Sequence, residues 1–118
     1  MKSSCLFCRI IAGEIPSKIL YQNDQVIAFE DIAPMAKHHL LFVHRQHTEN
    51  ICQMSNSAPN QLVEVMQAIA DFAAKAHLEA SGFRIVTNCG PDAGQTVFHT
   101  HFHVLYGEHL GPFGAKMK

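Results

Sequence analysis

Three histidines stand at every second position of residues 97–107, VFHTHFHVLYG, namely His99, His101 and His103. Side chains of a β-strand alternate between its two faces, so a strand here would carry all three imidazoles on one face, about 6.6 Å apart. A neutral imidazole can act both as a nucleophile and as a hydrogen-bond donor, because its ordinary pKa lies near neutrality. We interpret the row as a phosphoryl-transfer site in which His101 attacks phosphorus.

Other interpretations of the row start from the same spacing. Three exposed histidines without a function are improbable at strict alternation. Two alternating histidines can chelate a metal ion, but a third imidazole about 13 Å from the first cannot easily join that ion. His101, His103 and Glu108 also match the His-x-His-x4-Glu pattern of cupin metal sites. Cupins are small all-β barrels, and the long helix predicted over residues 58–81 does not fit such a barrel.

The elements that must position the row are readable from hydrophobic spacing and turn residues. Apolar residues at helical spacing predict a short helix over 5–12 and the long helix over 58–81, capped by Ser57 and ended by Gly82. Alternating or continuous apolar runs predict five strands, over residues 18–22, 25–31, 38–45, 83–88 and 96–106. The apolar run of the third strand predicts burial on both faces or at a partner.

The order of these elements, β-β-β-α-β-β, predicts an α+β fold: a five-stranded antiparallel sheet with one long helix on it and a short N-terminal helix. Asn23 and Asp24 are a natural turn pair between the first two strands. In the last strand, the alternation assigns Phe98, Thr100 and Phe102 to the face that the long helix covers, opposite the histidines. We expect residues 1–118 to form a single domain.

Composition narrows the class of protein. Across 118 residues the net charge is −1 with neutral histidine, and no basic stripe is visible, which argues against a nucleic-acid partner. No apolar run approaches the roughly 18 residues that span a membrane, and the N-terminus lacks a signal core. We expect a cytoplasmic protein without a membrane partner. Its four cysteines are too few for a disulfide scaffold.

The stretch GQTVFHTHFHVL, residues 94–105, closely resembles the signature of the histidine-triad (HIT) family. Further matches to its Hint branch are CLFCRII at 5–11, EIP at 14–16, AFEDIAP at 28–34 and VTN at 86–88. The third histidine separates this chain from uridylyltransferase-like relatives, which carry Gln there. The resemblance implies a HIT-like fold, a homodimer joined edge to edge, and hydrolysis of purine nucleoside phosphoramidates through a nucleotidylated histidine. The short chain and its CxxC opening favour Hint over the dinucleoside polyphosphate hydrolases, which share the triad.

The same resemblance implies a role for each matched residue. His101 corresponds to the nucleophile, His103 to the histidine that contacts the phosphate, and His99 to a residue that orients the row. His39 corresponds to a fourth, upstream histidine that communicates with the triad. The residues matched to nucleotide contacts are Phe29, Asp31, Ile32, Asn88, Gly94, Gln95, Thr96 and Val97. Of these, Asp31 would hold the ribose hydroxyls, while Phe29 and Ile32 would line the base pocket.

The pair Cys5-x-x-Cys8 is by itself half a zinc site. The resemblance implies that His47 and His99 complete it in some family members, while others keep these residue types without metal, so zinc binding stays open. No metal is required for the catalytic scheme. A zinc-stabilised nucleotide-binding or interaction module is therefore the alternative function, beside a dinucleoside polyphosphate hydrolase. Cys52 and Cys89 are interpreted as free thiols. His38, His44 and His109 receive no role.

Overall fold

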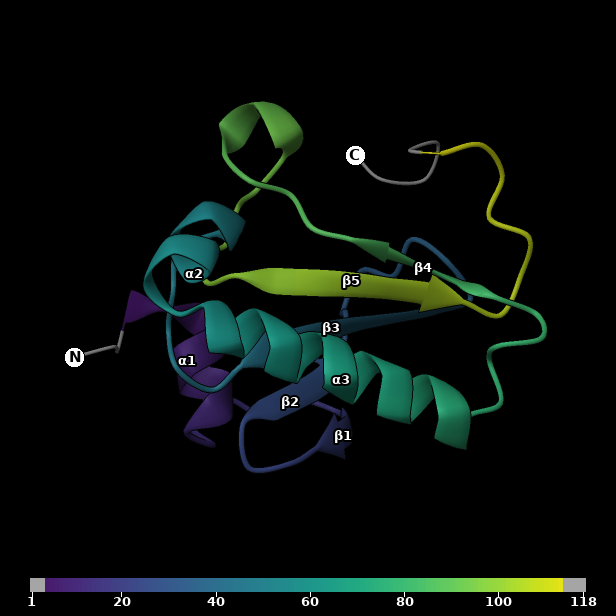
Figure 1. Cartoon of the computed structure of the whole chain (residues 1–118), viewed down its shortest axis with the longest axis horizontal. Helices are drawn as coiled ribbons and strands as arrows, with labels where there is room; N and C mark the ends of the chain where they lie inside the picture. The colour runs from purple at the N-terminus through teal and green to yellow at the C-terminus, as the bar shows by residue number, and fades with distance from the viewer. Residues whose placement is uncertain (1–3, 114–118) are drawn as a thin grey trace.

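Residues 4–113 are described by a computed structural model, shown in Figure 1. Its five strands are all antiparallel and form one sheet in the order β1-β2-β3-β5-β4, with β1 and β4 at the edges. The elements are α1 (Leu6–Ile11), β1 (Ile19–Gln22), β2 (Val26–Glu30), β3 (His38–His44), α2 (Ile51–Ser57), α3 (Pro59–Lys75), β4 (Phe83–Val86), the 3₁₀ helix η2 (Pro91–Ala93) and β5 (His101–Tyr106). The predicted α+β fold with a five-stranded antiparallel sheet is confirmed.

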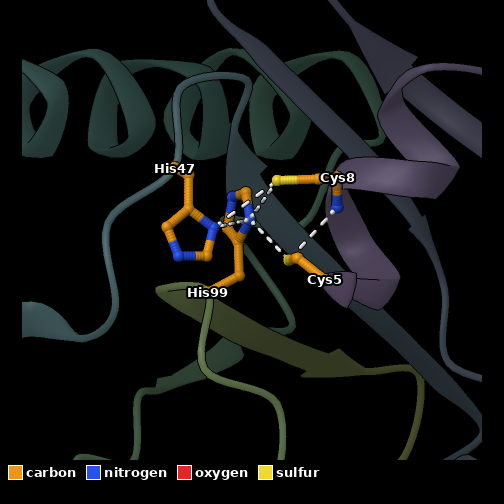
Figure 2. Close-up of side chains that lie close together, drawn as sticks. All are labelled: Cys5, Cys8, His47 and His99. Atoms are coloured by element: carbon orange, nitrogen blue, oxygen red, sulfur yellow. Dashed lines mark hydrogen bonds between the residues drawn. The ribbon is translucent and has the colours of Figure 1, made fainter. Parts of the chain in front are cut away.

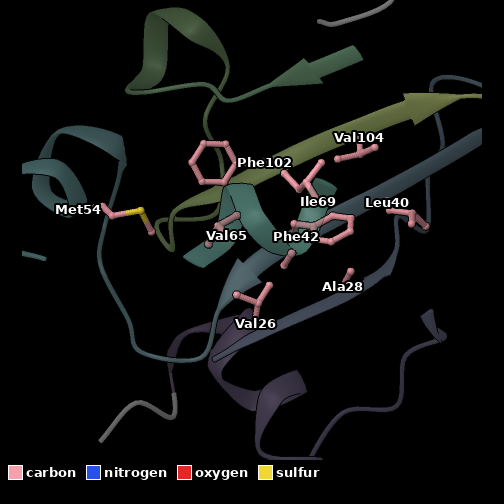
Figure 3. Packing of buried hydrophobic residues seen from close by; sticks show 10 residues of the cluster. Val26, Ala28, Leu40, Phe42, Met54, Val65, Ile69, Phe102 and Val104 are labelled. Atoms are coloured by element: carbon pink, nitrogen blue, oxygen red, sulfur yellow. The ribbon is translucent and has the colours of Figure 1, made fainter. Parts of the chain in front are cut away.

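The sheet is covered on both faces, which explains the continuous apolar run of β3. Helix α3 lies along one face (Figure 1), and a core forms there from side chains of β2, β3, β5 and α3 together with Met54 of α2 (Figure 3). Alternate residues of the same strands point to the opposite face. There Phe29 and Leu41 pack against Phe7 and Ile10 of α1. The face with α1 is the one that carries His39, His101 and His103.

The β1–β2 hairpin follows the predicted turn chemistry. The side chain of Asn23 accepts hydrogen bonds from the backbone N–H groups of Gln25 and Val26, at 2.9 and 2.8 Å. An asparagine that satisfies backbone donors two and three residues ahead closes a tight turn between strands. None of the helices in residues 4–113 is both long enough and apolar enough to cross a membrane.

The prediction of one helix over residues 58–81 is wrong at both ends. Its end comes at Lys75, because His77 takes a left-handed conformation with φ of 58° and the N–H of Leu78 then bonds the carbonyl of Ala73. Leu78 is buried, so the chain turns back onto the core before Gly82. At the start, Ala58 rather than Ser57 is the capping residue, and its side chain makes no capping bond.

A second helix, α2, precedes α3 and was not predicted. Its N-cap is Asn50, whose side chain accepts from the N–H of Gln53, while the Gln53 side chain accepts from the N–H of Glu49. This reciprocal pattern closely resembles a capping box and is a recognisable signal of a helix start. Pro59 begins α3 and lacks the N–H that would continue the hydrogen bonding of α2, so two helices form instead of one.

The last strand begins five residues later than the predicted 96–106. The N–H of Thr100 bonds the carbonyl of Thr48, and the hydroxyls of the two threonines lie 2.7 Å apart, so the backbone just before His101 is paired with the segment before α2. Phe98 therefore does not reach the core and is 52% exposed, contrary to the face we assigned to it. From His101 onward the prediction is confirmed, because Phe102 and Val104 face α3.

Candidate active site and metal centre

The two downstream histidines of the row lie on β5 and point away from α3, as the alternation predicts. His101 is 8% exposed and His103 is partly buried, with 5.1 Å between their ring centroids. Both line a cavity of about 370 Å³, a size typical of small-ligand sites. His99 precedes the strand and its side chain is directed elsewhere, toward Cys5, Cys8 and His47 (Figure 2). The side chains of the row therefore divide into two groups. His99 faces the two cysteines, whereas His101 and His103 face the cavity.

The proton position on His101 follows from its partner. Its Nδ1 lies 2.7 Å from the carbonyl oxygen of His99, and a carbonyl can only accept, so Nδ1 carries the hydrogen and donates it. The lone pair is then on Nε2. Burial, the largest cause, lowers the pKa of His101, while the bond to His99 and the charge of Asp31 oppose the shift. A neutral ring with an unprotonated Nε2 is the form that can attack phosphorus.

The proton position on His103 is set by a chain of two hydrogen bonds. The N–H of Met35 donates to Nδ1 of His39 at 3.0 Å, and a backbone N–H can only donate. His39 therefore carries its hydrogen on Nε2, which lies 2.8 Å from Nδ1 of His103 and donates to it. The hydrogen of neutral His103 is left on Nε2. Burial lowers the pKa of both rings, that of His103 to about 4, which keeps the chain neutral.

Asp31 lies beside this chain at the start of the loop after β2. One of its carboxylate oxygens accepts from the N–H of Ala33 at 2.8 Å, and the other lies 3.5 Å from Nε2 of His39. The ligand atoms of Asp31, His39 and His103 are close enough together to be considered for a metal ion. However, 2.8 Å between the two imidazole nitrogens is a hydrogen-bond distance, and one of those nitrogens carries a proton. We therefore interpret this cluster as a proton-positioning chain.

The cavity combines an apolar wall with a few polar groups. Its wall includes Leu6, Phe7, Ile10, Ile15, Phe29, Ile32, Leu41 and Val97, and its polar lining includes Asp31, Thr96, His101 and His103. Ile32 is 99% exposed and so lies at the rim, whereas Phe29 is buried. An apolar wall beside a carboxylate and two imidazoles suits a ligand with a flat ring, hydroxyl groups and a phosphate. Of the residues predicted to bind nucleotide, Phe29, Asp31, Ile32, Thr96 and Val97 thus lie together.

The other three predicted nucleotide contacts lie in the segment between β4 and β5. Gly94 has φ of 92°, a conformation that glycine adopts without strain, and it closes η2. Gln95 is buried and its polar groups are used inside the protein: its N–H bonds the carbonyl of Gly90, and its side chain bonds Gly90, Glu49 and Val97. Asn88 is partly buried just after β4. The structure thus gives Gln95 a clear role in shaping this segment.

Some contributors to the site received no individual role from the sequence. The hydroxyl of Thr87 donates to the carbonyl of His101 at 2.7 Å and so anchors the backbone at the candidate nucleophile. The Phe7 ring meets the His101 ring edge-on, with centroids 5.1 Å apart. The apolar pattern of 5–12 predicts α1, yet nothing in it shows that α1 docks beside the histidines. The amide of Met35, as a backbone group, leaves no trace in the sequence.

A separate cluster brings four potential metal ligands together, with all ligand atoms within 4.8 Å of one another (Figure 2). Its members are Cys5, Cys8, His47 and His99. The sulfur-to-Nδ1 distances are 3.5 Å for Cys5–His99, 3.5 Å for Cys8–His47 and 3.6 Å for Cys8–His99, and the two Nδ1 atoms are 3.2 Å apart. A tetrahedral zinc with bonds of about 2.3 Å to sulfur and about 2.0 Å to nitrogen requires roughly 3.5 Å and 3.3 Å for these separations.

The tautomer of His99 also fits a metal ligand. Its Nε2 lies 2.9 Å from the carbonyl oxygen of His44 and donates to it, so Nδ1 is left with its lone pair facing the two cysteines. A ligating histidine commonly donates its other N–H to a carbonyl in this way. The four residues named from the sequence thus fit zinc in type, distance and orientation.

The cupin-like set of His101, His103 and Glu108 is not assembled. Glu108 accepts from the N–H of Lys37 beyond the end of β5, and the fold is not an all-β barrel.

Comparison with known proteins agrees with this geometry. The HIT domain model matches residues 12–110. The purine nucleoside phosphoramidase of Escherichia coli is 35% identical over 115 residues, which are 98% of this chain and 97% of that protein. A histidine triad protein from Clostridium difficile superposes with a TM-score of 0.90 at 34% identity, covering 96% of this chain and 98% of the other. A HIT family hydrolase from Clostridium thermocellum has a TM-score of 0.85 at 41% identity, over 92% and 94%. The chain belongs to the HIT family.

Proposed function

We propose that this protein is a hydrolase that cleaves the P–N bond of purine nucleoside 5'-phosphoramidates through a nucleotidylated His101. The observation that carries the proposal is the pair of fixed tautomers, which gives His101 an unprotonated Nε2 and neighbouring His103 a protonated one at the same cavity. One nitrogen can attack phosphorus while the other donates to a phosphoryl oxygen. The relative named a purine nucleoside phosphoramidase supports this choice of substrate.

In the first step, Nε2 of His101 forms a bond to phosphorus as the bond from phosphorus to the amine breaks. The leaving nitrogen takes up one proton and departs as a neutral amine, and a general acid contributes typically about 10² to 10⁴-fold to such a step. His101 becomes a cation in the intermediate, and the carbonyl of His99 stabilises it by accepting the Nδ1 hydrogen. In the second step, water attacks phosphorus, the bond to His101 breaks, and the proton released by water balances the one consumed.

The remaining residues bind and orient the substrate in this scheme. The carboxylate of Asp31 would accept hydrogen bonds from the ribose hydroxyls, and the apolar wall formed by Phe7, Ile10 and Phe29 would hold the base. The side chain of Thr96, with the phosphate-facing N–H of His103, would contact phosphoryl oxygens. We propose that Cys5, Cys8, His47 and His99 bind a structural zinc ion that fixes α1 against the sheet and supplies no catalytic chemistry.

The test is to mix the protein with adenosine 5'-phosphoramidate, quench early and measure intact mass. We expect a fraction of the chains to gain one adenylyl group, which peptide mapping places on His101. His101→Ala should lose at least about 10³-fold in kcat, as expected for loss of a nucleophile, whereas the exposed His77→Asn should keep wild-type turnover. Full turnover by the His101 variant, or an adduct on another residue, would contradict the proposal.

Two alternatives remain for comparison in the same assay. A dinucleoside polyphosphate hydrolase would use the same two histidines but would turn over diadenosine polyphosphates faster than the phosphoramidate. A zinc-stabilised binding module would bind AMP without forming an adduct.

We also propose a homodimer, since β4 is a sheet edge and Ile85 on it is 41% exposed. Light scattering should then give twice the chain mass.

A further inference from the structure

The backbone just before the candidate nucleophile is held by a contact that lies beyond the end of the sheet. The ladder between β3 and β5 ends at the pair Val43 and His101. One residue before this pair, the N–H of Thr100 donates to the carbonyl of Thr48 at 2.8 Å. Thr48 lies in the loop between β3 and α2. The bond therefore ties that loop to the segment that leads into β5.

The peptide group that joins His99 to Thr100 makes a hydrogen bond at each end. Its N–H donates to Thr48, and its carbonyl, which belongs to His99, accepts the Nδ1 hydrogen of His101 at 2.7 Å. In a planar trans peptide the N–H and the C=O point in opposite directions. Any rotation of the N–H away from Thr48 therefore also turns the carbonyl away from the imidazole of His101.

The carbonyl of Thr48 is held by a further peptide group. It belongs to the peptide that joins Thr48 to Glu49, and the N–H of Glu49 donates to the side-chain oxygen of Gln53 in α2 at 2.6 Å. Three donors thus follow one another in the same direction, from His101 through two peptide groups to α2. Hydrogen bonds in such a chain polarise and strengthen one another. A chain of this polarity favours positive charge at its His101 end.

Two buried hydroxyl groups brace the central bond of the chain. The Oγ1 atom of Thr100 donates to the carbonyl oxygen of Thr48 at 3.2 Å, and it lies 2.7 Å from Oγ1 of Thr48. Because the hydrogen of the Thr100 hydroxyl is already used, the Thr48 hydroxyl donates across the shorter distance. Rotation of the peptide group would therefore break several buried hydrogen bonds at once.

We propose that Thr100, together with Thr48, is a positioning residue for the nucleophile. The hydroxyl pair holds the peptide group between His99 and Thr100, so that its carbonyl keeps the hydrogen of His101 on Nδ1 and leaves Nε2 free to attack. The effect on turnover rests on the proposed function, whereas the effect on the tautomer of His101 needs no substrate. The same chain stabilises the positive charge that the proposed intermediate places on His101.

A role in zinc binding is the competing explanation for the two hydroxyls. His47 directly precedes Thr48, and His99 directly precedes Thr100, so the brace also joins the segments of two proposed zinc ligands. The two explanations differ in what is lost with the hydroxyls. A brace for the metal site would lose zinc, whereas a brace for the nucleophile would lose the tautomer of His101 and keep the zinc.

The test compares three variants of the full chain as purified. Thr100→Val leaves the Thr48 hydroxyl buried without its partner, so the thermal midpoint should fall by about 5 °C or more. The double variant Thr48→Val/Thr100→Val should regain most of that stability, because replacing both partners by apolar groups of the same shape costs little. Thr100→Ser keeps the hydroxyl and should resemble the wild type. The set thus separates stability from positioning.

Two readouts follow the nucleophile itself. Long-range proton–nitrogen correlation spectra show which ring nitrogen of His101 carries the hydrogen, and His101→Ala identifies its signals by their loss. We expect the hydrogen on Nδ1 in the wild type and in Thr100→Ser, and a mixture of tautomers in both valine variants. With adenosine 5'-phosphoramidate, kcat should fall roughly 10- to 100-fold in both valine variants, with a smaller change in KM. Zinc content should stay at the wild-type value in all three.

An unchanged tautomer and wild-type kcat in the double variant would overturn the proposal. So would an equal loss in Thr100→Ser and Thr100→Val, because the hydroxyl would then not be the cause, and so would a loss of zinc that parallels the loss of turnover. Failure of the proposed function looks different. In that case the wild type would not turn over the phosphoramidate, while the tautomer of His101 would still change in the valine variants.

Discussion

Replacement of His39 tests whether proton placement on His103 matters for turnover. His39 is 1% exposed and bridges two groups: it accepts from the N–H of Met35 and donates to Nδ1 of His103. Glutamine can repeat both roles, because its side-chain oxygen accepts and its nitrogen donates. Leucine has a similar size but can do neither. The variants His39→Gln and His39→Leu thus differ mainly in whether the chain of hydrogen bonds survives.

The magnitude follows from the hydrogen bond that leucine removes. Leaving a buried nitrogen of His103 without its donor costs about 1–3 kcal/mol. If His103 must present its Nε2 hydrogen in the transition state, the same energy appears in the barrier and lowers kcat by roughly 5- to 150-fold. His39→Gln should stay within about tenfold of the wild type. His39→Leu should lose more in kcat than in KM, because ring placement matters most as charge develops on the phosphoryl group.

Single-turnover kinetics with adenosine 5'-phosphoramidate provide the assay, and circular dichroism checks that both variants fold. Wild-type rates in both His39→Gln and His39→Leu would refute the argument, since the hydrogen bonds would then not control the reaction. An equally severe loss in both would also refute it, since glutamine keeps the hydrogen bonds, and would show that the imidazole of His39 itself is required. His77→Asn is the matched control, because it also removes a histidine but lies at the end of α3.

Two more predictions concern stability and metal content. Burial lowers the pKa of His103 to about 4 from its ordinary 6.5, so the unfolded chain binds more protons between these values, and the free energy of unfolding should fall by about 2–3 kcal/mol as pH drops from 6.5 to 4. Urea titrations should show a smaller fall for His103→Asn, and an unchanged fall would contradict the assignment. Purified protein should contain one zinc per chain, and chelation should lower its thermal midpoint by about 10 °C or more. Cys8→Ser should lose the metal while Cys52→Ser keeps it, and equal zinc in both would refute the ligand set.

The sequence predicts the sheet well because its strands carry strong local signals. The paired alternation in β2 and β3 sends Ala28 and Phe42 to one face and Phe29 and Leu41 to the other, and the turn at Asn23 fixes where the hairpin begins. These signals are set by residues close together along the chain. Strand periodicity therefore sufficed to place His101 and His103 on the face opposite α3.

The failures come from contacts between distant segments. The long helix stops at Lys75 because burial of Leu78 turns the chain back onto the core, and helix propensity alone does not contain that information. The last strand begins at His101 because Thr48 pairs with Thr100, two residues that no local pattern connects. Likewise, the docking of α1 beside the cavity depends on tertiary contacts that the local sequence pattern does not show. The sequence identified the chemistry-bearing side chains but not the backbone groups that orient them.

The late start of β5 also explains how three histidines at the same spacing can have different roles. If the strand extended to residue 96, the imidazole of His99 would stand beside that of His101 on the same face. Instead, the side chain of His99 turns to Cys5 and Cys8, while its carbonyl accepts the Nδ1 hydrogen of His101. His99 therefore connects the proposed zinc site to the proposed nucleophile. Its imidazole anchors α1, and its backbone carbonyl fixes the tautomer of His101. A metal that holds His99 in place would thereby hold the reactive nitrogen of His101 toward the cavity without touching the substrate.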